Sequence, residues 1–479
     1  MSTTDAAAHE RNLVPGLATI IGFLVCVEIA SGILQGYYTP IFSDIADHLS
    51  IHDADVNWFE AAQLVVSALA VPMLARLGDL IGHRQVLLLS TAVTALASWG
   101  VAFAPTFATF LVAWAIQGFY VVWLPLEVSI IHRRTAGTGQ QARLTRRAAA
   151  FLVAALELGV IAGALTSGAL VESTSMTALL MIPAIAVSLC FVVVWFGVAP
   201  TPPVATGRLD MRGFWLVSVA IGLVMGGLIL VRLQGPGAPL AWVVLVLGLV
   251  AFWPFALAQL AAEEPLIDVR LLATPAQWPV QLTAFLFGMS VLGAQIPLST
   301  FARTDPDEAG FGLGASASFV STLIGVYVIA LVAGALLLPV VARFVGTRGA
   351  MLGACVLVAI GYGLFIPLHD STAQTLANMA IAGLGSGALV AALPAAAAAA
   401  APADRTGFVT GMTNTTKTIG GAIASSIFAI ALSSTGSIAD AKAGHAPLSG
   451  YITVWAVCSL TALVAALSLF VVPKDAFTD

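Results

Sequence analysis

Three ionisable side chains stand in the middle of long apolar stretches, where a charge is costly. They are Glu28, Glu157 and Lys417. A carboxylic acid in apolar surroundings takes up a proton readily, and an ammonium group that comes near it favours the charged acid instead. Ionisable residues in such stretches usually face a partner or a water-filled cavity. Proton uptake and release is the chemistry that suits these residues, although Glu157 with Lys417 is also compatible with a purely structural ion pair.

The elements that must position these residues are membrane spans. Hydrophobic residues make up 59% of the chain, charged residues 9%, and the mean hydropathy is +0.99. Soluble proteins carry about 25% charged residues. The few basic residues are dispersed between apolar runs, so that no patch is available to neutralise the phosphates of a nucleic acid. We therefore expect a multi-pass membrane protein, with the lipid bilayer rather than nucleic acid as its partner.

Apolar runs long enough to cross the hydrocarbon core as a helix recur along the whole chain. Fourteen can be marked, at about 14–38, 57–77, 86–104, 106–130, 148–170, 175–198, 213–232, 239–260, 278–301, 314–341, 350–368, 374–400, 408–433 and 450–472. With the N-terminus inside, the 19 lysines and arginines fall in cytoplasmic segments, except Arg232, Arg303, Lys417 and Lys442. Cytoplasmic loops retain basic residues, and a missed span would invert every later loop. The pattern predicts an all-α membrane protein with fourteen transmembrane helices and both termini cytoplasmic.

A short loop at the predicted cytoplasmic end of the second span carries the first motif. Residues 75–84 read ARLGDLIGHR and resemble the loop signature of the major facilitator superfamily, G-x-L-a-D-r-x-G-r-r. Gly82 permits a tight turn, and Asp79 suits a helix N-terminus. Arg84 can pair with an acid on a neighbouring helix, for which we choose Glu127. These four residues form the predicted cytoplasmic gate.

The fifth span carries a second motif. Residues 159–168, GVIAGALTSG, resemble the antiporter signature g-x-x-x-G-P-x-x-G-G. Small residues such as Gly159 and Gly163 let two helix backbones approach closely, which an interface that opens and closes can use. Ordinary small-residue packing produces a similar spacing without implying a direction of transport. The resemblance favours export and assigns Gly159 and Gly163 a gating role.

The resemblance extends over nearly the whole chain. The seventh and eighth spans, opened by LDMRGFW at 209–215 and closed by EPLIDVRLL at 264–272, look like the extra pair in fourteen-span drug:proton antiporters. The family fold then implies an N-terminal six-helix half at 1–200, a linker with two inserted helices at 201–273, and a C-terminal six-helix half at 274–479. In such folds the substrate lies between the halves, near the midplane.

The fourth span departs from that family. Its pattern R-x-x-q-G is matched by residues 114–118, WAIQG, so that Trp114 stands in place of the arginine linked in the family to proton coupling. Coupling must then use other groups, and we assign it to Glu157, Glu28 and Lys417. The first and fourth spans line the cavity in this family, which implies an aromatic site with a few polar anchors. The predicted substrate-binding residues are Gln35, Tyr38, Trp114, Gln117, Tyr120 and, in the second half, Asn414.

Two classes of function stay open from the sequence. The first is transport: proton-coupled export of small lipophilic molecules, or, as an alternative, uptake of a nutrient or anion with Lys417 holding the substrate charge. The second is a membrane sensor that has lost transport. No phosphate-binding loop, metal-ligand cluster or nucleophile triad is visible in the sequence, so we expect no enzyme, no cofactor and no metal. A monomer that binds its substrate and protons is expected.

Overall fold

The computed structural model describes residues 21–136, 140–203, 207–402, 405–433 and 446–471, which form helices and turns without a strand. A first helix covers 21–36. The elements that follow it are η1 (Thr39–Ile41), α2 (Phe42–Leu49), η2 (Asp53–Val56), α3 (Asn57–Ile81), α4 (His83–Ala102), α5 (Phe107–Gln117), η3 (Gly118–Val122), α6 (Trp123–Arg134), α7 (Gln141–Leu170), α8 (Met176–Gly197), α9 (Met211–Gln234), α10 (Pro239–Ala261), α11 (Val269–Leu272), α12 (Trp278–Val291), α13 (Gln295–Arg303), α14 (Pro306–Ala309), α15 (Ala317–Leu364), α16 (Thr372–Ala399), α17 (Thr406–Leu432) and α18 (Leu448–Leu469).

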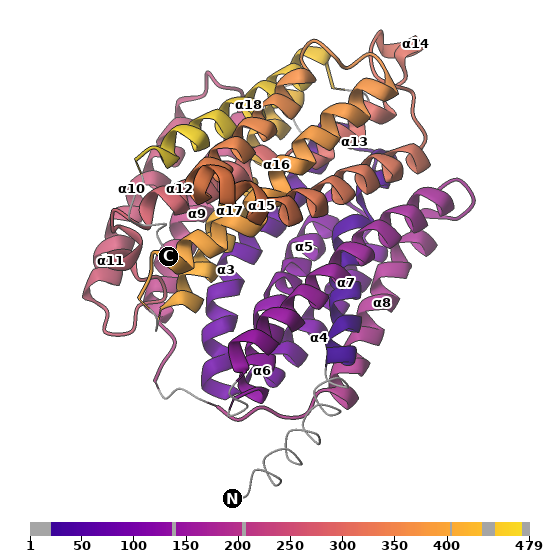
Figure 1. Cartoon of the computed structure of the whole chain (residues 1–479). Coiled ribbons are helices and arrows are strands. Elements are labelled where there is room, and N and C mark those ends of the chain that lie inside the picture. The colour runs from indigo at the N-terminus through magenta and orange to yellow at the C-terminus, as the bar shows by residue number, and fades with distance from the viewer. Residues whose placement is uncertain (1–20, 137–139, 204–206, 403–404, 434–445, 472–479) are drawn as a thin grey trace, which may run out of the picture.

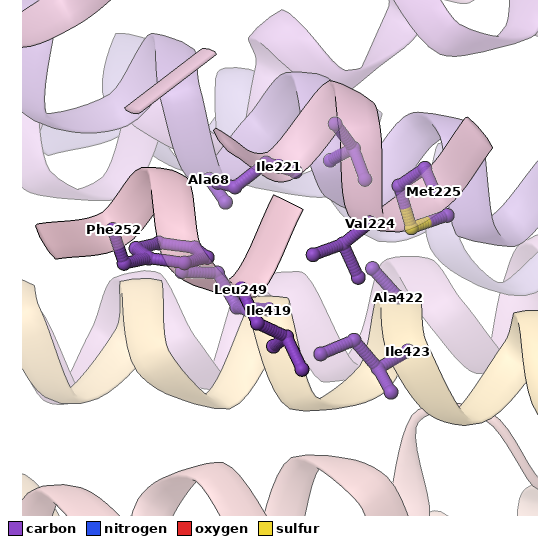
Figure 2. A pocket seen from close by; sticks show the side chains of 10 residues that line it. Ala68, Ile221, Val224, Met225, Leu249, Phe252, Ile419, Ala422 and Ile423 are labelled. Atoms are coloured by element: carbon purple, nitrogen blue, oxygen red, sulfur yellow. The ribbon is translucent and has the colours of Figure 1, made fainter. Parts of the chain in front are cut away.

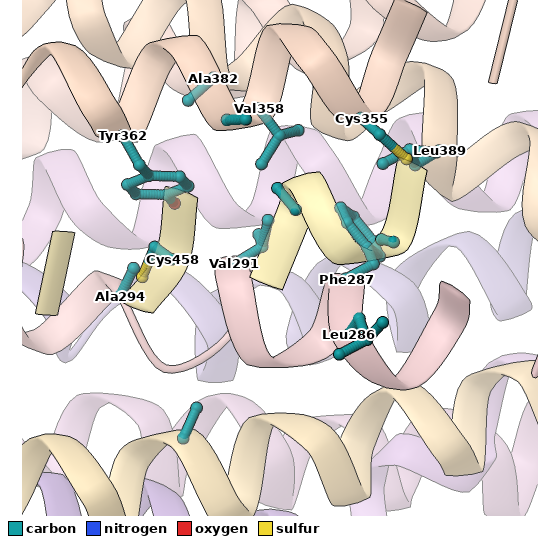
Figure 3. Close-up of a cluster of buried hydrophobic side chains, with 14 of the residues drawn as sticks. Leu286, Phe287, Val291, Ala294, Cys355, Val358, Tyr362, Ala382, Leu389 and Cys458 are labelled. Carbon is teal, nitrogen blue, oxygen red and sulfur yellow. The ribbon is translucent and has the colours of Figure 1, made fainter. Parts of the chain in front are cut away.

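Two large hydrophobic cores hold these helices together. With few exceptions, one collects buried side chains from 24–198 and the other collects side chains from 280–469. Figure 1 shows the corresponding helices as two neighbouring groups, indigo to magenta and orange to yellow. In the second core, Phe287 of α12, Val358 of α15 and Cys458 of α18 lie together (Figure 3). The division of the chain at residues 200 and 273 stays a prediction.

Thirteen helices in the described part of the chain are long and apolar enough to cross a membrane. One of them, α15, has 48 residues. At 1.5 Å per residue it extends about 72 Å, more than twice the hydrocarbon thickness. Its backbone leaves the helical conformation at Gly346, between the predicted tenth and eleventh spans. The all-α multi-pass fold is thus confirmed, whereas the total of fourteen and the side of the termini, which lie outside the described residues, stay predictions.

The surface of the bundle is apolar, as a bilayer requires. Large hydrophobic side chains stand out from several helices, among them Leu96, Phe196 and Phe344, which are 74%, 83% and 84% exposed. In water such a surface would cause association. Here it provides the contact with lipid that the composition predicts.

The inserted pair, α9 and α10, forms a helical hairpin beside the contact between α3 and α17. An apolar cavity of about 60 Å³ lies where these four helices meet. Figure 2 shows Val224 and Met225 of α9, Phe252 of α10 and Ile423 of α17 around it. The pair therefore contacts both halves of the molecule.

Candidate proton and substrate site

Two buried carboxyl groups face each other inside the N-terminal core. Glu28 lies on the first helix and Glu127 on α6, and both side chains are 0% exposed. The two carboxyl groups lie close enough to interact with each other. In the described part of the chain, none of their four oxygens has a hydrogen-bond partner. Two neighbouring carboxylates cannot both stay charged in apolar surroundings without a cation, so the pair holds at least one proton.

In this conformation Glu127 is not paired with Arg84, the partner that the sequence suggested. Because α6 continues to Arg134, beyond the predicted end of that span at 130, Glu127 lies about 10 Å from the end of the helix. Arg84 instead donates hydrogen bonds to the carbonyl oxygens of Val198 and Trp195, where α8 ends. The last carbonyls of a helix lack partners within the helix and carry its negative partial charge, so they attract a guanidinium group.

The other residues of the signature loop contact nearby parts of the chain. Asp79 forms an ion pair with Arg133 at 3.3 Å and lies 3.5 Å from Nε2 of His83. Gly82 ends α3 with a φ of 106°, a conformation that glycine adopts readily. A Cβ atom at Gly82 would lie 2.3 Å from the carbonyl oxygen of Thr201. The loop is therefore packed against the segment that follows α8, and its role as a gate stays a proposal.

Glu157 of α7 and Lys417 of α17 lie in opposite halves, close enough for their charges to interact. In the described part of the chain, no ion pair within 4.0 Å joins them. Tyr327 of α15 also lies near Glu157. The two residues thus lie within range of a charge interaction but form no direct salt bridge in this conformation, and their role in proton coupling stays a proposal.

Three of the predicted substrate residues, Tyr38, Trp114 and Gln117, pack together inside the N-terminal half. Trp114 is only 2% exposed, and its ring centroid lies 4.4 Å from that of Tyr38. Gln117 donates hydrogen bonds to the Tyr38 hydroxyl at 3.1 Å and to Ser98 Oγ at 3.0 Å. Tyr120 lies near both Glu60 and Glu28. This group packs inside the N-terminal half rather than lining an open surface in this conformation.

The two remaining predicted substrate residues lie elsewhere. Gln35 is exposed on the first helix, where its Nε2 donates to Ser31 Oγ at 3.4 Å. Asn414 is half-buried on α17, one turn from Lys417. No hydrogen bond or ring contact that the structure describes joins either residue to Trp114. Their binding roles stay proposals.

The glycines of the antiporter-like segment do bring backbones together, but mainly within one half. A Cβ atom at Gly159 would lie 2.5 Å from the carbonyl oxygen of Ile29 on the first helix, and Gly163 contacts that helix one turn later. Contact with the other half comes from the carbonyl oxygens of Ala164 and Gly168. They accept hydrogen bonds from Ser321 at 2.6 Å and from Ser318 at 2.9 Å, both on α15. The contact with the other half therefore begins next to Gly163, and the gating role of Gly159 and Gly163 stays a proposal.

Sequence reasoning missed the closure at the predicted external end. Asp44 of α2 and Arg303 of α13 form an ion pair at 2.8 Å, and the Ser299 hydroxyl donates to the Thr39 carbonyl oxygen. These contacts join the two halves, so this end is closed. The charge pattern could have indicated this contact, because Arg303 is one of the few basic residues predicted on the external side of the membrane and faces an acidic loop.

The described residues hold no group of three or more His, Cys, Asp or Glu side chains arranged around a possible metal ion. The four cysteines are free thiols, Cys26 being exposed and the other three buried. The candidate site thus consists of carboxyl, amide and aromatic groups.

Sequence relatives of this chain include transporters with different named substrates. The uridine/deoxyuridine transporter of Lactococcus lactis subsp. cremoris is 24% identical over 317 residues, which cover 64% of this chain and 64% of that protein. This match spans less than two thirds of the relative's length. The cephamycin export protein CmcT of Amycolatopsis lactamdurans is 26% identical over 407 residues, covering 83% of this chain and 81% of that protein.

The fold is shared with solved transporters. The crystal structure of the nucleoside transporter NupG matches with a TM-score of 0.63 over 95% of this chain and 99% of that chain. At 14% identity this likeness concerns the fold alone. The family model described as Major Facilitator Superfamily matches residues 24–425, from the first helix into α17. The chain belongs to the Major Facilitator Superfamily.

Proposed function

We propose that the protein is a proton-coupled exporter of small hydrophobic molecules, working by alternating access as a monomer in a bacterial inner membrane. Membership of a transporter superfamily supports transport itself. The observation that carries the proton-coupled proposal is the pair of fully buried carboxyl groups, Glu28 and Glu127. A carboxyl pair that holds a proton while it is shielded from water, and releases the proton when water reaches it, can act as a proton carrier.

The cycle follows from where the pair lies. With the external end closed by Asp44 and Arg303, Glu28 and Glu127 are shielded and hold their proton. Opening that end would let the pair take up protons from outside, and opening the cytoplasmic end would admit the water that stabilises the released charge. Substrate that disturbs the neighbouring Tyr120 would then change how readily the pair releases its proton. Substrate leaves the cell as protons enter.

Glu157 and Lys417 are proposed as a second site that responds to the approach of the halves. When the two groups separate, the carboxyl group loses its favourable cation and its protonated form becomes preferred. Their proximity across the halves supports this role. They also stay the alternative proton carriers.

The direction of transport and the substrate class rest on the relatives. A cephamycin exporter matches over 83% of this chain, which supports export of a drug-like or secondary-metabolite molecule. The uridine/deoxyuridine transporter supports uptake as the second candidate, in which Lys417 would bind a polar or anionic substrate. The buried, aromatic surroundings of Trp114 favour an apolar substrate over a charged one.

The proposal predicts that a drug-sensitive bacterial host expressing the protein tolerates higher concentrations of some hydrophobic antibiotics than the same host with an empty vector. A panel that spans β-lactams, dyes and polyketides, together with accumulation of radiolabelled uridine, distinguishes the candidates. Raised tolerance with lower intracellular drug supports export. Uridine accumulation without raised tolerance would establish uptake instead, and neither effect, with the protein present in the membrane, would favour the non-transporting sensor.

A further inference from the structure

A buried ion pair ties the inserted hairpin to the N-terminal half. Arg232 in the last turn of α9 holds Asp55 through two hydrogen bonds, Nε to Oδ1 at 3.1 Å and Nη2 to Oδ2 at 2.9 Å. The two side chains are 3% and 0% exposed. Asp55 belongs to η2, which leads directly into α3. A paired, fork-shaped contact of this kind fixes orientation as well as distance.

The opposite end of the hairpin is also attached to the N-terminal half. Arg76 of α3 forms an ion pair with Glu264 at 2.9 Å, just after α10. Before α9, Arg133 and Arg134 of α6 donate to the carbonyl oxygens of Pro202 and Ala199 at 3.1 and 3.0 Å. Both connecting segments thus dock on helices of the same half.

The two connecting segments are joined to each other through Asp210. Its carboxylate accepts hydrogen bonds from the backbone N–H of Gly213 at 2.8 Å, from Gln259 Nε2 at 2.6 Å and from the N–H of Leu266 at 3.3 Å. Partial burial raises the pKa of Asp210, but these hydrogen bonds outweigh it and leave the pKa below its ordinary value. The charged form therefore closes the base of the hairpin at neutral pH.

The contact with the C-terminal half is of another kind. Between the hairpin and α17 the described contacts are mostly apolar, and the cavity of about 60 Å³ lies where both meet α3 (Figure 2). Two weak polar contacts reach the C-terminal half: Ser426 Oγ donates to the weak acceptor Met225 Sδ at 3.8 Å, and the half-exposed Arg405 lies 3.8 Å from Asp268, in the segment after α10. Apolar surfaces without directional bonds slide more easily than hydrogen-bonded ones.

We propose that Asp55 and Arg232 are positioning residues that make the inserted hairpin part of the N-terminal rigid body, so that α17 slides past it when the halves rearrange. The inference adds to the proposed transport cycle but does not depend on its substrate or on proton coupling. It needs only that the halves move relative to each other.

Distances between spin labels test this in the full chain after its four cysteines are replaced by serine. Exposed positions for the labels are Leu96 on α4, Trp253 on α10 and Leu460 on α18. The Arg303→Ala variant lacks the external ion pair and is used to obtain a second conformation. A change in the Leu96–Leu460 distance shows that its halves have moved. We expect the Trp253–Leu460 distance to shift with it and the Trp253–Leu96 distance to stay constant. A shift in the Trp253–Leu96 distance with a constant Trp253–Leu460 distance would overturn the proposal.

A second measurement needs no change of conformation. In the Arg232→Met variant, which keeps length but loses charge, the Trp253–Leu96 distance distribution should broaden. Exchanging the two charges, with Asp55→Arg and Arg232→Asp together, should narrow it again. An unchanged distribution in Arg232→Met would show that the ion pair does not hold the hairpin, whatever the protein transports.

Discussion

Replacing Glu28 with glutamine is expected to lower the initial rate of proton-driven export by about tenfold or more. This corresponds to a rise of at least about 1.4 kcal/mol in the activation free energy of transport. The amide mimics the protonated acid and cannot release a proton. Exchange of labelled for unlabelled substrate across the membrane needs no net proton transfer and should persist. Reconstituted vesicles with and without an imposed pH gradient separate the two activities.

Glu127→Gln should show the same separation, because both carboxyl groups belong to one pair. Glu172→Gln, at an exposed position after α7, is the matched control and should behave as wild type. Full proton-driven export by both Glu28→Gln and Glu127→Gln would remove the pair as the carrier. A loss confined to Glu157→Gln would then transfer the role to the site near Lys417.

Replacing Gly36 with alanine is expected to cause a large loss of stability. Its new Cβ atom would lie 2.1 Å from the carbonyl oxygen of Val160, which is backbone of α7 and cannot rotate away. Overpacking of this kind costs about 1–3 kcal/mol. The thermal unfolding midpoint of the purified protein should fall, and transport should fall with it.

Gly222→Ala is the control for that substitution, because no described atom lies within 4 Å of the added Cβ. Alanine has the higher helix propensity, so this variant should be as stable as wild type or slightly more so. Equal midpoints for Gly36→Ala and Gly222→Ala would mean that the first helix and α7 are free to separate in the folded protein.

Much of the fold could be predicted because apolar runs and basic loops are direct consequences of the bilayer. The inserted helices, predicted at 213–232 and 239–260, are found at Met211–Gln234 and Pro239–Ala261. The run at 314–341 and the run at 350–368 both fall on α15, which continues through the bend at Gly346. Composition locates such helices well, because an uninterrupted run of apolar residues can cross the membrane in only one place.

The partners of charged residues could not be predicted in the same way. The sequence placed Glu127 near a span end, yet η3 interrupts that span and α6 extends further, which moves Glu127 inward to face Glu28. Likewise, Arg232 reads as an exception to the charge pattern, and only the fold reveals Asp55 opposite it. Which charged residues form pairs depends on how each helix is rotated and how deep it lies in the membrane. Both can change by a helical turn without any change in the hydropathy of the sequence.

The central claim, exchange of substrate against protons, is tested most directly by proton movement that a substrate gradient drives. Wild-type protein is reconstituted into vesicles that enclose a pH-sensitive dye, and the compound to which it confers most tolerance is added outside. Coupled exchange predicts that the interior becomes more alkaline as substrate enters, with no change in protein-free vesicles. Entry of the compound with an unchanged or more acidic interior would contradict the account.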